Sequence, residues 1–332
     1  MNHQIRYMPH ILLRDFIWPI CFFMAAVLSG SCNCNRGAGP VEGDGKSQLQ
    51  IADPFILNYQ GRYYAYGTGE DGFRVYVSDD LVDWTAKGIA LDLDNCWGTK
   101  WFWAPEVYYI ESRDIFYMFY SAEEHICVAT STSPEGPFVQ DEMEPIREEQ
   151  GIDASLFIDR DGKAYLYFVR FTDGNVIWVA EMNDDLKSLK EETLTKCLSA
   201  EEPWETIMGK VAEGPSVFKD GETYYLLYSA NDYQSQDYAV GYATASSPLG
   251  PWTKCEGNPI FRRGFPNAGN LVGIGHGAPL MTTDGKLMYV FHAHDCDTVI
   301  HPRRTYVNSE LKIAPDGTLS MLGKVIVPQL QD

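Results

Sequence analysis

One unit recurs along this chain and limits the folds open to it: a short apolar strand, a turn containing glycine, and a second strand rich in tyrosine or phenylalanine. Residues 55–66 and 107–120 are two examples. Five such units, each of roughly 40–60 residues, start near residues 51, 103, 152, 212 and 275, and this period is typical of propeller blades. Short aromatic runs between Asp-Gly-type turns indicate strands. The sequence therefore predicts an all-β, single-domain, five-bladed β-propeller with four strands in each blade.

Ionisable residues stand at nearly the same place in four of the units. Asp53, Asp153 and Glu213 precede the glycine of the first turn by 8, 9 and 8 positions, and His276 precedes its glycine by 9. Because the first strand of each blade lines the central channel, we expect these side chains to face one shared funnel. Buried ionisable groups are costly unless they are solvated, paired or used. The pattern suggests catalysis by carboxylates; the alternative for each acid alone is a cap on a local turn.

The charge balance narrows the range of partners. The 332 residues carry a formal net charge of −20, which argues against nucleic acid, because its recognition needs a basic face. The same charge disfavours anionic membrane surfaces and strongly acidic polysaccharides. A neutral substrate fits best.

The first residues have the layout of a targeting segment. Arg6 and Arg14 precede an apolar run over residues 16–28, three small residues follow, and Cys32 comes next. This layout predicts a signal peptide over residues 1–31, since the run is shorter than the roughly 20 residues that span a bilayer. Cys32 suggests a bacterial lipoprotein site, although Ser29 stands where such sites prefer leucine; the alternative is an ordinary cysteine. We expect an exported protein, in the periplasm or held at the cell surface by a lipid on Cys32.

Composition predicts the remaining boundaries. Residues 32–49 are polar and rich in glycine and serine, as a flexible tether would be. Residues 50–325 form the predicted propeller, and residues 326–332 form a C-terminal tail.

Several motifs together resemble glycoside hydrolase family 43 over about residues 50–325. They are Ala52-Asp53-Pro54, Ile152-Asp153-Ala154, Glu213-Gly214-Pro215, Trp103-Ala104-Pro105-Glu106, and the Ser-Pro-x-Gly-Pro-aromatic turns at residues 133–138 and 247–252. The resemblance implies the same propeller fold and a hydrolase of glycosidic bonds. Neutral oligosaccharide or polysaccharide side chains would be its substrates.

The resemblance also implies three unequal roles for the acids. Asp53 would be the general base that deprotonates the attacking water, and Glu213 the general acid that protonates the leaving oxygen. Asp153 would orient Glu213 and raise its pKa, because like charges repel. One carboxyl must stay ionised and another protonated, so their surroundings must differ. Inversion of the anomeric centre would place the carboxyls of Asp53 and Glu213 about 6.5–9.5 Å apart.

The implied activity is exo-acting release of terminal pentose or furanose units from plant cell-wall glycans. An α-L-arabinofuranosidase leads, with β-xylosidase and β-galactofuranosidase or galactosidase as alternatives within the family. Outside it, the alternatives are a non-catalytic glycan-binding propeller, and a related propeller enzyme acting on fructosides or by phosphorolysis.

Three further residues are candidates for the supporting site. In the family, a histidine at the place of His276 lies on the propeller axis, near a calcium ion or its water shell; a hydrogen-bonded channel histidine is the alternative. Arg304, preferred over Arg303, resembles an arginine that reaches the sugar or the acids. Trp103 matches the family's Trp-Ala-Pro and would form a sugar-stacking wall, with core packing as the alternative. No cofactor is required, and a calcium ion on the axis is a second expectation.

Overall fold

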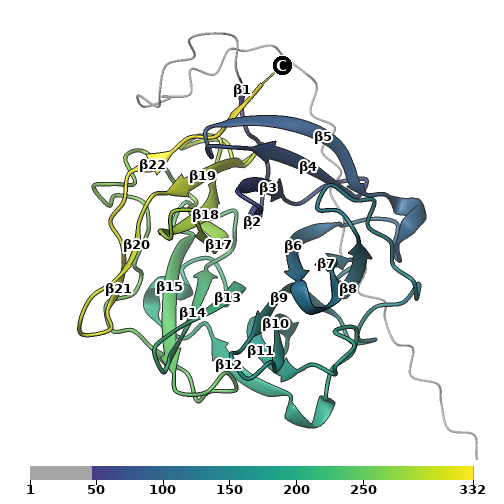
Figure 1. The fold of residues 1–332 in the computed structure, drawn as a ribbon. Coiled ribbons are helices and arrows are strands. Elements are labelled where there is room, and N and C mark those ends of the chain that lie inside the picture. The colour runs from purple at the N-terminus through teal and green to yellow at the C-terminus, as the bar shows by residue number, and fades with distance from the viewer. Residues whose placement is uncertain (1–46, 332) are drawn as a thin grey trace, which may run out of the picture. The chain divides into compact units, whose positions relative to one another are not determined.

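The computed structural model describes residues 47–331. Within them, five blade sheets stand around one axis, and their innermost strands contact one another in ring order (Figure 1). The helices among the described residues are single 3-10 turns: η1 (Leu93–Asn95), η2 (Glu111–Arg113), η3 (Glu191–Thr193) and η4 (Pro203–Glu205). The predicted all-β, five-bladed propeller is confirmed.

Each blade begins with its innermost strand, and later strands follow outward. Blade 1 has β2 (Phe55–Tyr59), β3 (Arg62–Tyr66), β4 (Phe73–Ser78) and β5 (Asp83–Leu91). Blade 2 has β6 (Trp103–Ile110), β7 (Ile115–Ala122) and β8 (His125–Ser131). Blade 3 has β9 (Gly151–Ile158), β10 (Ala164–Phe171), β11 (Asn175–Glu181) and β12 (Thr195–Ser199). Blade 4 has β13 (Ala212–Asp220), β14 (Thr223–Ala230), β15 (Ala239–Ala245) and β16 (Thr253–Lys254). Blade 5 has β17 (Gly275–Met281), β18 (Leu287–Ala293), β19 (Arg304–Asn308) and β22 (Val325–Ile326), with the hairpin β20 (Leu311–Ile313) and β21 (Leu319–Met321) inserted before β22.

Blade 2 departs from the predicted four strands. Its outer edge is reduced to a single bridge between Thr130 and Val139. A Ser-Pro turn and Pro137 lie between these residues, as in blade 4, where the strand β16 follows the equivalent turn.

The two ends of the described chain meet on blade 1. Strand β23 (Gln329–Leu330) runs parallel to β5, and β1 (Ser47–Gln48) pairs antiparallel with β23. Leu49 is buried, and its N–H donates to the carbonyl of Pro328 at 2.9 Å. The folded region is therefore wider than the predicted residues 50–325, because both flanking segments join this sheet.

The two Ser-Pro-x-Gly-Pro turns join neighbouring blades. The hydroxyl of Tyr66 in blade 1 donates to the carbonyl of Pro134 in blade 2. In the same way, the hydroxyl of Tyr167 in blade 3 donates to the carbonyl of Pro248 in blade 4 at 2.7 Å. Both tyrosines are fully buried, so each phenol needs such a partner. The repeated motif thus has a structural role between blades.

A bulge at the start of each inner strand aims side chains at the axis. In blades 2 to 5, two residues of the inner strand oppose one residue of the next strand, and such bulges re-aim side chains. The first bulge residue has a left-handed backbone in every blade: Asp53 (φ 49°), Ala104 (45°), Asp153 (59°), Gly214 (56°) and His276 (40°). Asp53, Asp153 and His276 therefore share one repeat position, whereas Glu213 lies one residue before it.

Candidate active site

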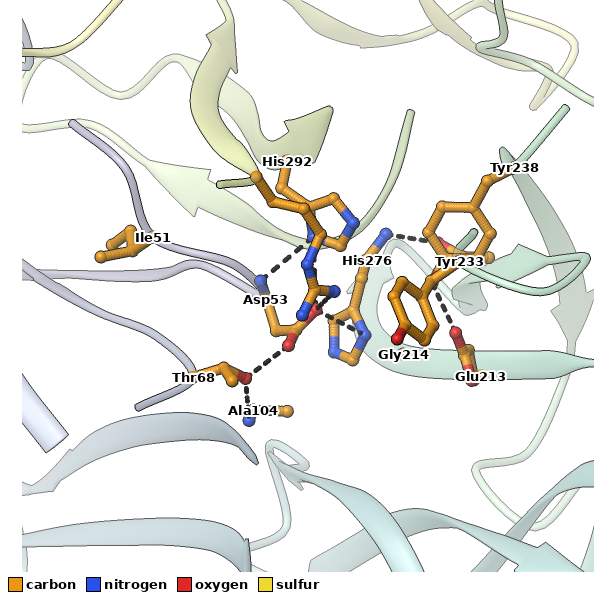
Figure 2. Close-up of polar contacts among 12 residues, drawn as sticks. Ile51, Asp53, Thr68, Ala104, Glu213, Gly214, Tyr233, Tyr238, His276 and His292 are labelled. Carbon is orange, nitrogen blue, oxygen red and sulfur yellow. Dashed lines mark hydrogen bonds and ion pairs between the residues drawn. The ribbon is translucent and has the colours of Figure 1, made fainter. Parts of the chain in front are cut away.

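The three acids predicted to converge are all buried near the axis with His276. Asp53, Asp153 and Glu213 are 8%, 6% and 8% exposed. His276 lies between the two aspartates, with its Nδ1 3.5 Å from Asp53 Oδ1 and 4.0 Å from Asp153 Oδ2. Figure 2 shows Asp53 and His276 facing each other, with Glu213 on the blade 4 side. The bulges thus bring together the residues that the repeat singled out.

Asp53 is surrounded by basic side chains. Arg303 Nη1 donates to Asp53 Oδ1 at 2.8 Å, and the hydroxyl of Thr68 donates to Oδ2. Burial alone would raise the pKa of Asp53, but the charges of Arg303 and His276 lower that pKa well below its usual value. The contact with His292 lowers it further. Asp53 is therefore ionised at neutral pH.

His292 holds the backbone of Asp53. Its Nδ1 accepts the N–H of Asp53 at 3.1 Å. Burial and the charge of Arg303 lower the pKa of His292 to about 3, so the ring is neutral and Nδ1 has a free lone pair. His292 is not among the residues predicted above, because histidines that alternate on a strand, as His292 and His294 do, are usually packed or hydrogen-bonded.

The choice of Arg304 over Arg303 as the arginine at the acid cluster is wrong. Arg304 forms an ion pair with Asp295, with Nε 2.6 Å from Oδ1. Arg303 instead contacts Asp53, and its guanidinium lies over the ring of Tyr233 at 4.8 Å. Neighbouring residues of a strand point to opposite sides, so only one of the two arginines can face the acids. The register of β19, in which Arg304 pairs with Ala293, decides that it is Arg303.

Glu213 accepts hydrogen bonds from uncharged donors. The hydroxyl of Tyr238 donates to Oε1 at 2.8 Å, and the amide of Asn175 donates to Oε2 at 2.9 Å. Burial and the nearby charge of Asp153 raise the pKa of Glu213 to about 7. A carboxyl in this state keeps a proton available near neutral pH.

Asp153 is tied to the peptide that follows Glu213. Its Oδ2 accepts the N–H of Gly214 at 3.0 Å. Burial raises the pKa of Asp153, while His276 and this hydrogen bond oppose the rise. A Cβ on Gly214 would lie 3.2 Å from the His276 ring, and the backbone is left-handed, so glycine fits this position best.

Trp103 is half-buried and packs against the core between blades 3 and 4. Its ring stacks on Trp101, with centroids 5.9 Å apart and planes inclined by 19°. Trp101 is 45% exposed. Of the two rings, Trp101 is therefore the one that presents more surface to solvent, and Trp103 supports it.

Four contact residues of this site were missed: Thr68, Asn175, Tyr238 and His292. They come from segments of blades 1, 3, 4 and 5 and carry no common motif. Glu106 is a further acid in this region. Burial raises its pKa to about 7, and the Tyr108 hydroxyl donates to it.

Within residues 47–331, no group of three or more His, Cys, Asp or Glu side chains is arranged to hold a metal ion. His276 Nδ1 lies 3.5 Å from Asp53 and 4.0 Å from Asp153, and its part in holding a metal ion stays a prediction. The calcium ion on the axis stays a prediction.

A propeller whose inner bulges bury one ionised carboxyl and one carboxyl of raised pKa has the features of a glycosidase site. The comparison with protein families agrees. The chain belongs to glycosyl hydrolases family 43, whose model matches residues 47–319. The resemblance inferred from the acid motifs is thus confirmed.

Solved structures and curated proteins extend this comparison. An endo-1,4-beta-xylanase from Bacteroides thetaiotaomicron VPI-5482 is 53% identical, with a TM-score of 0.84 over 87% of this chain and 99% of that chain. A thermostable family-43 glycoside hydrolase is 38% identical, with a TM-score of 0.76 over 84% of this chain and 95% of that one. The beta-D-galactofuranosidase of Aspergillus niger is 30% identical over 226 residues, which cover 61% of this chain and 63% of that protein, less than two thirds of its length.

The predicted signal peptide and Cys32 lie outside the described residues, as does most of the predicted tether. Across residues 47–331, no helix has the length and apolar character needed to cross a membrane.

Proposed function

We propose that this family 43 protein hydrolyses terminal glycosidic bonds with inversion, using Asp53 as general base and Glu213 as general acid. The observation that carries the proposal is that the surroundings of two equally buried carboxyls shift their pKa values in opposite directions. Asp53 has a pKa well below its usual value, and Glu213 has a pKa of about 7. Such a separation assigns the base and the acid.

The chemistry follows from these states. A water molecule on the Asp53 side gives a proton to that carboxylate as its oxygen forms a bond to the anomeric carbon. On the other face, Glu213 gives its proton to the glycosidic oxygen as the bond to the leaving group breaks. Inversion requires room for that water, and we expect about 6.5–9.5 Å between the two carboxyls. Proton exchange with solvent then restores both side chains.

Asp153 acts through Glu213. Its negative charge disfavours ionisation of Glu213, so the acid keeps its proton until the leaving oxygen needs it. Its hydrogen bond to the N–H of Gly214 supports the orientation of the adjoining acid.

The proposed substrates are terminal pentose or furanose units of plant cell-wall glycans, with α-L-arabinofuranosides first. A net charge of −20 supports a neutral glycan. The stacked Trp101 and Trp103 offer an aromatic surface for a sugar ring. A second candidate is the β-1,4-xylosidic bond, which is supported by 53% identity to a protein named as an endo-1,4-beta-xylanase.

A panel of 4-nitrophenyl α-L-arabinofuranoside, β-D-xyloside and β-D-galactofuranoside tests the proposal with the wild type, Asp53→Asn and Glu213→Gln. We expect one sugar to be cleaved by the wild type and proton NMR to show the inverted anomer first. Unchanged rates in either variant would overturn the assigned roles, and a retained anomer would overturn inversion.

We further propose that the protein is exported and carries a lipid on Cys32. The support is the basic, apolar and small-residue order of residues 1–31. Labelling bacteria with radioactive palmitate should mark the wild type and Cys34→Ala but not Cys32→Ala. Equal labelling of both variants would contradict the anchor.

A further inference from the structure

A ring of hydrogen bonds joins each blade to the next around the axis. The first bulge residue of every blade donates its N–H to a side chain of the blade before it. The five bonds are Asp53 to His292 Nδ1 (3.1 Å), Ala104 to Thr68 Oγ1 (3.1 Å), Asp153 to Ser121 Oγ (3.0 Å), Gly214 to Asp153 Oδ2 (3.0 Å) and His276 to Ser229 Oγ (2.7 Å). Every left-handed bulge residue thus has its buried N–H satisfied.

Four of the five acceptors occupy one position of the repeat. This position is on the second strand of the blade, opposite the residue of the first strand that directly precedes the bulge. Ser121 pairs with Trp103, Ser229 with Glu213, and His292 with Gly275. In blade 1 the N–H of Thr68 bonds to the carbonyl of Ala52 at 3.0 Å, which places Thr68 at the same position.

Blade 3 is the exception. Its residue at this position is Val169, which pairs with Ile152 and is fully buried. The side chain of valine has no atom that can accept a hydrogen bond. The N–H of Gly214 would therefore be unsatisfied if another group did not reach it, and a buried N–H without an acceptor destabilises the fold.

Asp153 supplies the missing acceptor. It is the bulge residue of blade 3, and its Oδ2 crosses to the Gly214 N–H of blade 4. The carboxylate that raises the pKa of Glu213 is thereby bonded to the residue next to Glu213. In blade 1 a hydroxyl takes this place instead: Thr68 accepts the N–H of Ala104 and donates to Asp53.

We infer that Val169 is a positioning residue for the general acid: by offering no acceptor, it reserves the Gly214 N–H for Asp153 and so holds Asp153 beside Glu213. This inference rests on the proposed roles of Glu213 and Asp153. Val169 itself touches no reacting atom in this scheme, and it acts through the carboxylate.

Val169→Thr tests the inference, because threonine has nearly the shape of valine. Blade 1 shows the expected result, with the new hydroxyl accepting the Gly214 N–H and donating to Asp153. Val169→Ser gives the same chemistry with the residue found in blades 2 and 4, should the first variant fold poorly. Val169→Ala is the matched control, since it loosens packing without adding an acceptor.

The kinetic readout compares two leaving groups on whichever sugar the wild type cleaves. A methyl glycoside needs protonation by Glu213, whereas a 2,4-dinitrophenyl glycoside does not. General acid catalysis is worth about 10²–10⁴-fold, so its partial loss in Val169→Thr should lower kcat for the methyl glycoside about tenfold. The dinitrophenyl rate should change less than about twofold, and Val169→Ala should keep the wild-type ratio of the two rates. Equal losses on both substrates, or the same ratio change in Val169→Ala, would overturn the inference.

A crystal structure of Val169→Thr gives an answer that needs no substrate. We expect the hydroxyl to stand between Gly214 and Asp153, with their direct contact lengthened beyond the 3.0 Å of the wild type. An unchanged direct contact would overturn the inference even if the wild type is an active glycosidase. If the panel of glycosides shows no hydrolysis, the proposed function and this catalytic role fail together, while the structure still decides the contact.

Discussion

Asp53 and Glu213 are equally buried, at 8% exposure each, yet the two sides of the site shift their pKa values in opposite directions. On the side of blades 1 and 5, Asp53 meets the positive charges of Arg303 and His276. On the side of blades 3 and 4, Glu213 meets the neutral donors Tyr238 and Asn175 and the negative Asp153. Depth alone raises the pKa of both carboxyls, so their neighbours decide which one is suited to the proposed role of base and which to that of acid.

Removing either carboxyl should have the largest effect. Asp53→Asn and Glu213→Gln should each lower kcat on a 4-nitrophenyl glycoside by about 10²–10⁴-fold, because each removes one proton transfer. The two variants should respond differently to the leaving group. A 2,4-dinitrophenyl glycoside should restore the activity of Glu213→Gln, whereas Asp53→Asn should stay inactive on it. Steady-state rates on the two substrates check this. Rescue of both variants alike would erase the proposed distinction between the two sides.

Replacing Arg303 should weaken the Asp53 side alone. Arg303 lowers the pKa of Asp53, so Arg303→Met should raise that pKa. Since the base must be ionised, the acidic limb of the kcat profile should move to higher pH by about one unit or more. Arg304→Met is the matched control, because that guanidinium pairs with Asp295, and its acidic limb should stay in place. A shift in the control and none in Arg303→Met would return the role to Arg304.

Replacing Tyr238 should affect the Glu213 side by a smaller amount. Its hydrogen bond lowers the pKa of Glu213, which is about 7 in the wild type. Tyr238→Phe should therefore raise that pKa and move the alkaline limb to higher pH, because Glu213 must be protonated to act. A neutral donor contributes less than a full charge, so we expect a shift of roughly half a unit. The acidic limb of the same profile is the internal control; movement of that limb would mean that the two sides are not independent.

Replacing Trp101 with a small residue should change the pKa of neither Asp53 nor Glu213. Loss of a stacking surface is worth about 0.5–1.5 kcal/mol, so Trp101→Ala should raise KM about 2–10-fold with kcat and both pH limbs unchanged. Met281→Ala removes a similarly exposed apolar side chain at the far end of β17 and should leave KM as it is. A fall in kcat for Trp101→Ala would assign this ring to the reaction centre.

The blades and the three acids could be predicted from the amino-acid pattern alone. Alternating apolar strands, glycine turns and the Ser-Pro turns each depend on a few neighbouring residues, so they can be recognised without a structure. Asp53, Asp153 and Glu213 could be selected because a repeat that closes on an axis brings equivalent positions together. The fourth strand predicted for blade 2 is a single bridge in the structure, and its Ser-Pro turn does not explain this difference, because blade 4 carries the same turn and forms β16.

The differences between the acids arise from contacts between distant segments of the chain. The inward arginine is Arg303, whose partner Asp53 lies 250 positions away in the sequence. Strand register and packing between blades also decide three other features. They are the offset of Glu213 from the bulge, the donors Tyr238 and Asn175, and the missing hydrogen-bond acceptor at Val169. Protonation in a buried site is set by charges and donors within a few ångströms, and these come from distant segments that local sequence patterns do not relate to one another.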